Sequence, residues 1–162
     1  SLYGSWAGAF GNFQFMPSTL NNYAFDYDKN GSIDLKNIND SFASAANYLS
    51  RMGWDNNKPC FFKINLKSSI PDKYLNTSAK KIKNEQTVEF FKKYISDNQS
   101  LNKYKNLKSA IVTPDFDIVD NSKKHYPAYI VFDNYKLILK WNRSLRFGLA
   151  VCTLKNKFSN EL

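Results

Sequence analysis

The sequence has few of the residues and motifs on which redox, zinc and phosphate chemistry are usually built. It contains two cysteines, one histidine and six glycines in 162 residues. A CxxC pair, an HExxH motif and a glycine-rich phosphate loop are all missing, so no motif points to a redox dithiol, a zinc protease or a nucleotide-binding loop. Because its only histidine, His125, falls in a polar loop beside two lysines, a Ser-His-Asp triad has little support.

The two cysteines allow one disulfide but do not establish a redox compartment. Cys152 lies in an apolar helical pattern, where a free cysteine packs as a small hydrophobic side chain. Cysteine is among the residues most often simply buried. We therefore expect two free thiols, with a bond between Cys60 and Cys152 as the alternative.

Long hydrophobic runs are also missing, so the sequence predicts no membrane-spanning segment. No signal peptide is recognisable, because Ser1 already lies in a segment with the pattern of a folded domain. Any anchor or export signal is expected in a longer precursor.

What the chain has in excess is positive charge, with a formal net charge of +9. Such a chain can meet nucleic acid, an anionic membrane or another anionic polymer. The lysines are scattered through the middle and the end of the chain and form no stripe along a helix. This distribution favours a solvated basic surface, and it leaves a nucleic-acid binder with only the charge in its favour.

The chain is 43% hydrophobic and 16% aromatic, which predicts one globular domain with a substantial core. Apolar periodicity predicts helices over 17–25, 39–52, 87–95 and 142–158, and strands over 61–66, 107–112 and 128–132. The expected apolar face of the second helix comprises Phe42, Ala45, Ala46, Leu49 and Met52. Residues 135–141 are expected to form a hairpin with 128–132 across Asp133-Asn134.

These elements predict an α+β fold that is mainly α-helical, in which a small β-rich insert interrupts a helical core. The exposed, lysine-rich segment 67–84 is expected to be a loop. The last helix is apolar on most of its sides, as buried helices are, so we expect it to pack back against the first two.

An acidic loop follows the first predicted helix. Asp26, Asp28, Asn30 and Gly31 fit positions one, three, five and six of an EF-hand calcium loop. Alternating oxygen ligands can wrap a hard cation, to which the Ser32 carbonyl and Asp34 would contribute. Position twelve is asparagine, however, and the next carboxylate belongs to Asp40, about one helical turn later. The alternative is an acidic turn held by side-chain hydrogen bonds to its own backbone.

The segment 5–18 is crowded with small and aromatic residues. Gly8 and Gly11 permit a close approach of the backbone, and the Gln14 amide, between two phenylalanines, must find hydrogen-bond partners. Its local chemistry alone favours a tightly packed turn with a satisfied core glutamine.

Three stretches of the sequence resemble the B-type lytic murein transglycosylases. They are Gly11-Asn-Phe-Gln-Phe-Met-Pro17, similar to the Gly-x-x-Gln-x-x-Pro core of these enzymes, the acidic loop from Asp26, and Ala46-Asn47-Tyr48. The resemblance is strong over 3–54 and weak over 55–125. It returns over 129–154, where Asn134-Tyr135 and Lys140-Trp141-Asn142-Arg143-Ser144 are similar to the family's last segment.

The resemblance implies a lysozyme-like helical core with an EF-hand-like loop and a small β-rich subdomain. Its implied divisions are a partial catalytic core over 1–54, a small α/β subdomain over 55–141 and a returning helix over 142–162. It also implies a structural calcium ion, because the family's loop places its last acidic ligand at the position of Asp40. The implied calcium ligands are Asp26, Asp28, Asn30, Ser32, Asp34 and Asp40.

The implied activity is non-hydrolytic cleavage of the MurNAc–GlcNAc bond of peptidoglycan, giving 1,6-anhydro-MurNAc. Peptidoglycan carries carboxylates on its stem peptides, so the basic charge suits it. The resemblance further implies a periplasmic location, with outer-membrane anchoring of the full-length protein left open. The substrate-binding positions implied by resemblance are Ser5, Gln14, Tyr48, Trp141 and Asn142. Trp141 stands where the family usually has a tyrosine, and it loses the phenolic oxygen.

One departure concerns the catalytic acid. The family uses a single glutamate that protonates the leaving oxygen and then acts as a base on the sugar's 6-hydroxyl. That glutamate precedes the stretch that begins at Ser5, whereas this chain has no acidic residue before Asp26. We therefore expect the glutamate upstream of Ser1 and this chain alone to be inactive, with a non-catalytic peptidoglycan-binding module as the alternative.

Overall fold

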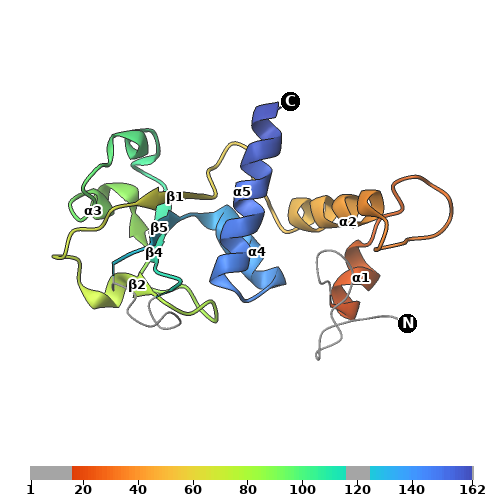
Figure 1. Cartoon of the computed structure of the whole chain (residues 1–162), viewed down its shortest axis with the longest axis horizontal. Coiled ribbons are helices and arrows are strands. Elements are labelled where there is room, and N and C mark those ends of the chain that lie inside the picture. Colours follow the sequence, from red (N-terminus) through yellow and green to blue (C-terminus); the bar gives the residue numbers. More distant parts are fainter. Residues whose placement is uncertain (1–15, 116–124, 162) are drawn as a thin grey trace. The chain divides into compact units, whose positions relative to one another are not determined.

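The computed structural model describes residues 16–115 and 125–161. The chain divides between Asp55 and Asn56 into two compact units. The first unit contains α1 (Pro17–Tyr23) and α2 (Ile38–Arg51), joined by the acidic loop (Figure 1). Both predicted helices are confirmed. The Asn37 side chain caps α2 by accepting a hydrogen bond from the Asn39 N–H at 2.9 Å, as N-cap asparagines do.

The buried face of α2 is more polar than the periodicity predicts. It comprises Asp40, Ser41, Ser44, Ala45 and Tyr48, whereas Phe42 is 40% exposed and Ala46 is exposed as well. The predicted apolar face is therefore wrong at these two residues. Polar side chains of α2 bind the backbone between the two helices. The buried Ser44 Oγ accepts from the Phe25 N–H at 2.9 Å, and the half-buried Asn47 amide donates to the Tyr23 carbonyl, at the end of α1, at 3.0 Å.

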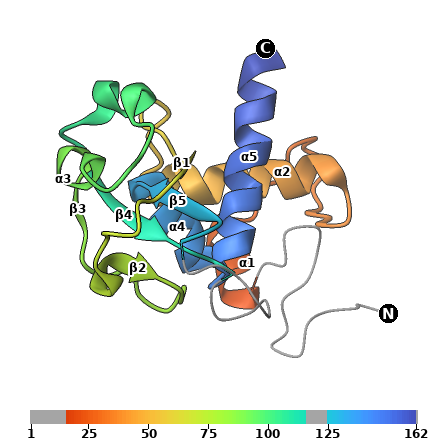
Figure 2. The same ribbon diagram turned by 60° about the vertical axis from the view of Figure 1, so that its left-hand side comes forward.

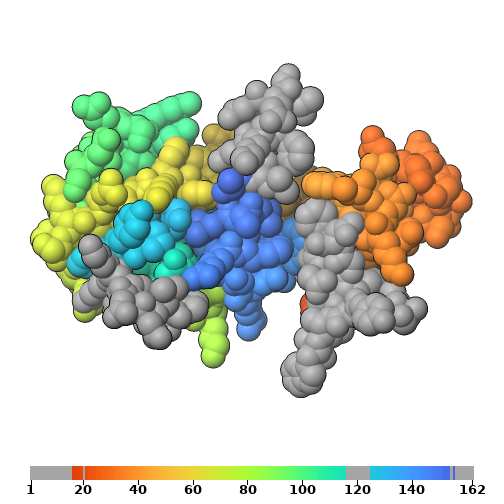
Figure 3. Space-filling model, viewed as in Figure 1, coloured from red at the N-terminus to blue at the C-terminus, as the bar shows by residue number. Residues whose placement is uncertain are grey.

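The second unit is built around a five-stranded sheet. Its strands are β1 (Phe61–Ile64), β2 (Leu75–Asn76), β3 (Gln86–Thr87), β4 (Lys108–Val112) and β5 (Ala128–Val131). The order is β1-β5-β4-β2, with β3 also paired to β4. All pairs are antiparallel except β2 with β4. In the space-filling view the side chains of 126–131 (cyan) lie beside those of the segment after residue 60 (yellow), as the β1–β5 pairing requires (Figure 3).

Helices cover this sheet on both sides. They are α3 (Val88–Lys92), α4 (Asp133–Trp141) and α5 (Leu145–Glu161), with short 3-10 turns η1 (Asp72–Tyr74) and η2 (Gln99–Tyr104). The sheet lies between α3 and α4, and α5 packs against α4 (Figures 1 and 2). A core cluster on the α3 side includes the fully buried Val88, Phe91 and Ile130. Of the described helices, none is both long and apolar enough to cross a membrane.

The predicted hairpin over 128–141 is wrong, because residues 133–141 form helix α4. The neighbours of β5 in the sheet are β1 and β4, so no edge of β5 remains for the following segment. The buried residues Tyr135, Ile138 and Leu139 recur at three- and four-residue spacing, which suits a helix. The remaining predicted strands and helices are present, with bounds that differ by a few residues.

A close contact joins α4 to α5. The buried Tyr135 hydroxyl donates to the Leu145 carbonyl at 2.8 Å, and a Cβ added at Gly148 would lie 2.7 Å from the Tyr135 ring. Glycine is therefore needed at position 148 for the two helices to approach. The chain from 142 onward thus packs within the second unit, and its predicted return onto residues 1–54 stays a prediction.

The expectation of two free thiols is also wrong. Cys60 and Cys152 form a disulfide that joins the residue before β1 to α5, across 92 positions of sequence. Their Cα atoms are 5.9 Å apart, within the range that disulfides span. The burial expected for Cys152 is nevertheless correct, because its side chain is fully buried.

We expect the disulfide to stabilise the second unit by about 2–4 kcal/mol, because it closes a long loop in the unfolded chain. Reduction should therefore lower the melting temperature of the oxidised protein. In the Cys60→Ser/Cys152→Ser variant the same reductant should change nothing. Two free thiols titrated in the unfolded, unreduced protein would contradict this prediction.

Candidate functional site

The acidic loop between α1 and α2 is folded around its own carboxylates. Asp26 accepts hydrogen bonds from the Asn30 N–H at 3.3 Å and the Gly31 N–H at 2.9 Å. Gly31 adopts a φ of +84°, which favours glycine because it lacks a Cβ. The sharp turn expected at the sixth position of a calcium loop is therefore present.

Further side chains bind backbone N–H groups along the loop. Asp28 accepts from the Asn30 N–H at 3.1 Å, and the Asn30 side chain accepts from the Ser32 N–H at 2.8 Å. Asp34 accepts from the Lys36 N–H at 2.9 Å. These are the side-chain turns that the sequence offered as the alternative to calcium. Each accepting oxygen keeps a second lone pair that a cation could use, so the two interpretations are compatible.

Asp40, from the first turn of α2, is fully buried and closes the loop. One carboxylate oxygen accepts from the Tyr27 N–H at 3.0 Å, and the other accepts from the Asp34 N–H at 2.9 Å. Its two oxygens thus hold both arms of the loop against the helix. Each oxygen keeps a second lone pair that a cation could use.

Three of the predicted ligands are brought together. Asp26, Asp28 and Asp40 each present a carboxylate oxygen within 4.8 Å of the others. Asp34 is not in this group. Desolvation raises the pKa of Asp26, but backbone N–H donors, that of Gly31 foremost, outweigh it and hold the pKa below its ordinary value. An anionic oxygen cluster of this kind fits a hard cation such as calcium.

Tyr48 is the one predicted cleft residue that the structure describes in the first unit. Its side chain is 5% exposed, and its ring packs edge-on against Tyr23 with centroids 4.9 Å apart. Burial, with a smaller contribution from Tyr23, raises the pKa of the Tyr48 hydroxyl. The phenol is therefore protonated at neutral pH and can donate a hydrogen bond.

Trp141 and Asn142 lie at the end of α4 in the second unit. Trp141 is 8% exposed and packs against Phe147 of α5, with ring centroids 5.6 Å apart. Asn142 is half-buried in extended conformation, and its N–H donates to the Ile138 carbonyl at 2.9 Å. Trp141 thus serves the packing of its own unit, and its contact with a sugar stays a prediction.

Ser5 and Gln14 lie outside the described residues. Their assignment to the cleft therefore also remains a prediction.

Comparison with known proteins identifies the family. The family model described as "Transglycosylase SLT domain" matches residues 1–156. This chain belongs to that family. It is also 46% identical, over 54 residues, to the membrane-bound lytic murein transglycosylase B of Escherichia coli strain K12; the alignment covers 33% of this chain and 15% of that protein.

Solved transglycosylase structures share the fold. SltB3 from Pseudomonas aeruginosa, in complex with NAG-anhNAM-pentapeptide, matches with a TM-score of 0.76 and 28% identity, over 98% of this chain and 40% of that one. The E. coli lytic transglycosylase Slt35 in complex with calcium matches with a TM-score of 0.67 and 24% identity, over 94% and 45%. The chain thus spans less than half the length of these relatives.

The residues of this transglycosylase domain that sequence reasoning missed are the polar ones that support the loop. Ser44 and Asn47 bind the backbone that leads into the loop, on the same face of α2 as Asp40. The signal was available, because polar residues at 40, 44 and 47 recur at four- and three-residue spacing on one helical face. Hydrophobic periodicity overlooks such a stripe.

We expect Asp40→Ala to destabilise the first unit even with calcium removed by a chelator. The change leaves the Tyr27 and Asp34 N–H groups without their acceptor, at a cost of about 1–3 kcal/mol each. Asp28→Ala is the matched control. Asp28 is exposed, and the Asn30 N–H that donates to it also donates to Asp26, so this N–H keeps an acceptor in the variant. Thermal unfolding in chelator should show a clear loss for Asp40→Ala and little change for Asp28→Ala. Equal melting temperatures would contradict the role given to Asp40.

Proposed function

We propose that this chain is part of a lytic transglycosylase that cleaves the MurNAc–GlcNAc bond of peptidoglycan and leaves 1,6-anhydro-MurNAc. The observation that carries the proposal is the family match over residues 1–156. The P. aeruginosa relative was solved with NAG-anhNAM-pentapeptide and with NAG-NAM-pentapeptide, which supports glycan strands as the substrate. Family membership favours this function over a non-catalytic wall-binding module.

The predicted cleft residues suit the binding of an amino sugar. Ser5, Gln14 and Asn142 would bind hydroxyl and N-acetyl groups. The protonated Tyr48 hydroxyl would donate a hydrogen bond to the sugar or to the catalytic carboxyl. These residues position the substrate, and none of them supplies a proton at the pKa that a general acid needs.

The general acid is the missing component. Residues 1–25 contain no carboxylate, and the carboxylates of Asp26 and Asp40 are engaged by backbone N–H groups. A low pKa at Asp26 suits a cation ligand and not an acid that must hold a proton at neutral pH. The glutamate would come from a part of the protein outside these 162 residues.

The acidic loop would hold a structural calcium ion. Asp26, Asp28 and Asp40 are assembled for this purpose, and Asn30, the Ser32 carbonyl and Asp34 lie on the same loop as further oxygen donors. The ion would neutralise the clustered carboxylates and join α1 to α2. The E. coli relative solved with calcium supports this assignment.

A periplasmic location follows from the proposed substrate, since the wall lies there in bacteria with an outer membrane. Nucleic acid is not among the proposed partners.

We expect calcium to bind the wild-type chain and to raise its melting temperature, because a ligand of the folded state adds about 2.7 kcal/mol at a hundredfold excess over its Kd. Asp28→Ala should bind far more weakly, and chelation should leave its melting temperature nearly unchanged. Glu89→Ala removes an exposed carboxylate elsewhere and should behave as wild type. Calorimetric heats that are equal for wild type and Asp28→Ala would end the calcium proposal.

We expect this chain alone to release no anhydro-muropeptides from purified sacculi. Positioned acid–base catalysis is worth about 10²–10⁴-fold, and the chain lacks the acid. Mass spectrometry of the digest provides the measurement. A longer protein that includes an upstream glutamate should give product, and its Glu→Gln variant should not. Product from this chain that disappears in Gln14→Ala or Asn142→Ala would overturn the proposal that the acid lies elsewhere.

A further inference from the structure

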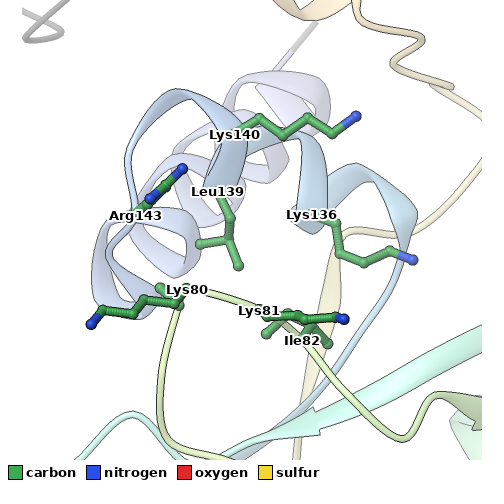
Figure 4. A pocket seen from close by; sticks show the side chains of 8 residues that line it. Lys80, Lys81, Ile82, Lys136, Leu139, Lys140 and Arg143 are labelled. Carbon is green, nitrogen blue, oxygen red and sulfur yellow. The ribbon is translucent and has the colours of Figure 1, made fainter.

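A basic groove runs along one side of the second unit. Two adjoining pockets form it, of about 310 and 340 Å³, and they share Ala79, Lys80 and Arg143. One wall is the segment 77–82, and the other is the C-terminal half of α4 continued to Arg146. Figure 4 shows the first pocket, with Leu139 pointing from α4 toward Ile82 on the opposite wall.

Four of the six cations that line this groove have no anionic partner among the described residues. Among the described residues, Lys80, Lys81, Lys140 and Arg143 form no ion pair, and no acidic side chain lines either pocket. Lys136 differs. Burial lowers its pKa, but its contacts with Asp133 at 2.8 Å and Glu85 at 2.6 Å outweigh burial and raise the pKa. The chain therefore pairs its half-buried lysine and leaves four neighbouring cations open to a ligand.

Both walls are held in place by internal bonds. Asn76 is buried, its amide donates to the Ile111 carbonyl at 2.9 Å, and its carbonyl accepts from the Lys83 N–H at 2.8 Å. This fixes both ends of the 77–82 wall. Across the groove, the Tyr135–Leu145 hydrogen bond ties α4 to the chain just after Arg143, and the Arg146–Asp115 ion pair, at 2.7 Å, holds the same segment. A ligand therefore does not have to order the backbone of the walls, and the remaining ordering cost is that of the exposed cationic side chains.

We propose that this groove binds the carboxylates of an acidic peptide that has small apolar side chains. Under the proposed function, on which this inference rests, that peptide is the stem of peptidoglycan. Arg143 offers a planar fork that matches a carboxylate, and the lysines offer further donors. Leu139, Ile82 and Ala79 provide an apolar floor for methyl groups. A phosphate polymer would use the cations but leave this floor unoccupied.

The test compares ligands on the whole chain at low ionic strength. The probes are a GlcNAc–anhydroMurNAc disaccharide, the same disaccharide carrying a pentapeptide, that ligand with its carboxylates amidated, the pentapeptide alone, and an oligo(glycerol phosphate). Calorimetry should show tighter binding with the pentapeptide than without it. Amidation should remove that gain, and added salt should reduce it.

The matched variants are Lys80→Gln/Arg143→Gln in the groove and Arg51→Gln/Lys105→Gln on exposed surface elsewhere, with the same loss of charge. The groove variant should bind the peptide-bearing ligand about threefold to tenfold more weakly, as expected for two exposed ion pairs. Its affinity for the bare disaccharide should be unchanged. The surface variant should bind both ligands as the wild type does.

The remaining outcomes separate the groove from the proposed cleavage. Equal binding of the two disaccharides, or equal losses in both variants, would overturn the groove and leave the proposed cleavage intact. Tighter binding of oligo(glycerol phosphate) would overturn the peptide in favour of a phosphate polymer. Binding of the pentapeptide without the bare disaccharide would support the groove and count against the cleavage proposal.

Discussion

The buried carboxylate of Asp40 is the interaction on which the loop and both helices of the first unit depend. Its oxygens accept one N–H from each arm of the loop, from Tyr27 and from Asp34. A buried carboxylate is costly unless it is fully hydrogen-bonded, so the loop backbone and Asp40 satisfy one another. Ser44 and Asn47, on the same helical face, bind the chain just before the loop. The short α1 thus gains its position through hydrogen bonds to α2 as well as through apolar packing.

This arrangement has a consequence for the proposed calcium ion. The carboxylate oxygens of Asp26, Asp28 and Asp40 lie within 4.8 Å of one another in this hydrogen-bonded loop. Clustered carboxylates repel, and the N–H donors around Asp26 and Asp40 offset part of that repulsion. A cation would neutralise the rest. Its binding energy would therefore add to the stability of the folded loop.

Hydrophobic periodicity identified most elements correctly, and its failures have identifiable causes. Residues 137–139 are three apolar residues in a row, a pattern that a buried strand and a buried helix share. Only the sheet partners of β5 decide between them. The Cys60–Cys152 pair, 92 positions apart, is a product of the fold and has no local signature. The acidic loop could be predicted because its candidate cation ligands lie close together in the sequence. The cleft residues came from family resemblance, and no local pattern could have supplied them.

The spatial arrangement of the positive charges is likewise decided by the fold and has no local signature in the sequence. In the sequence the lysines are scattered, and this distribution predicts a solvated surface for a net charge of +9. Folding brings Lys80 and Lys81 opposite Lys140 and Arg143, across an apolar floor and without a carboxylate among the described lining residues. Like charges gathered in this way repel, so the arrangement favours an anionic ligand over bare solvent. Under the proposed function, two sets of residues would then bind the substrate. The predicted cleft residues would bind the sugar, and the cations of the groove would bind the carboxylates of the attached peptide.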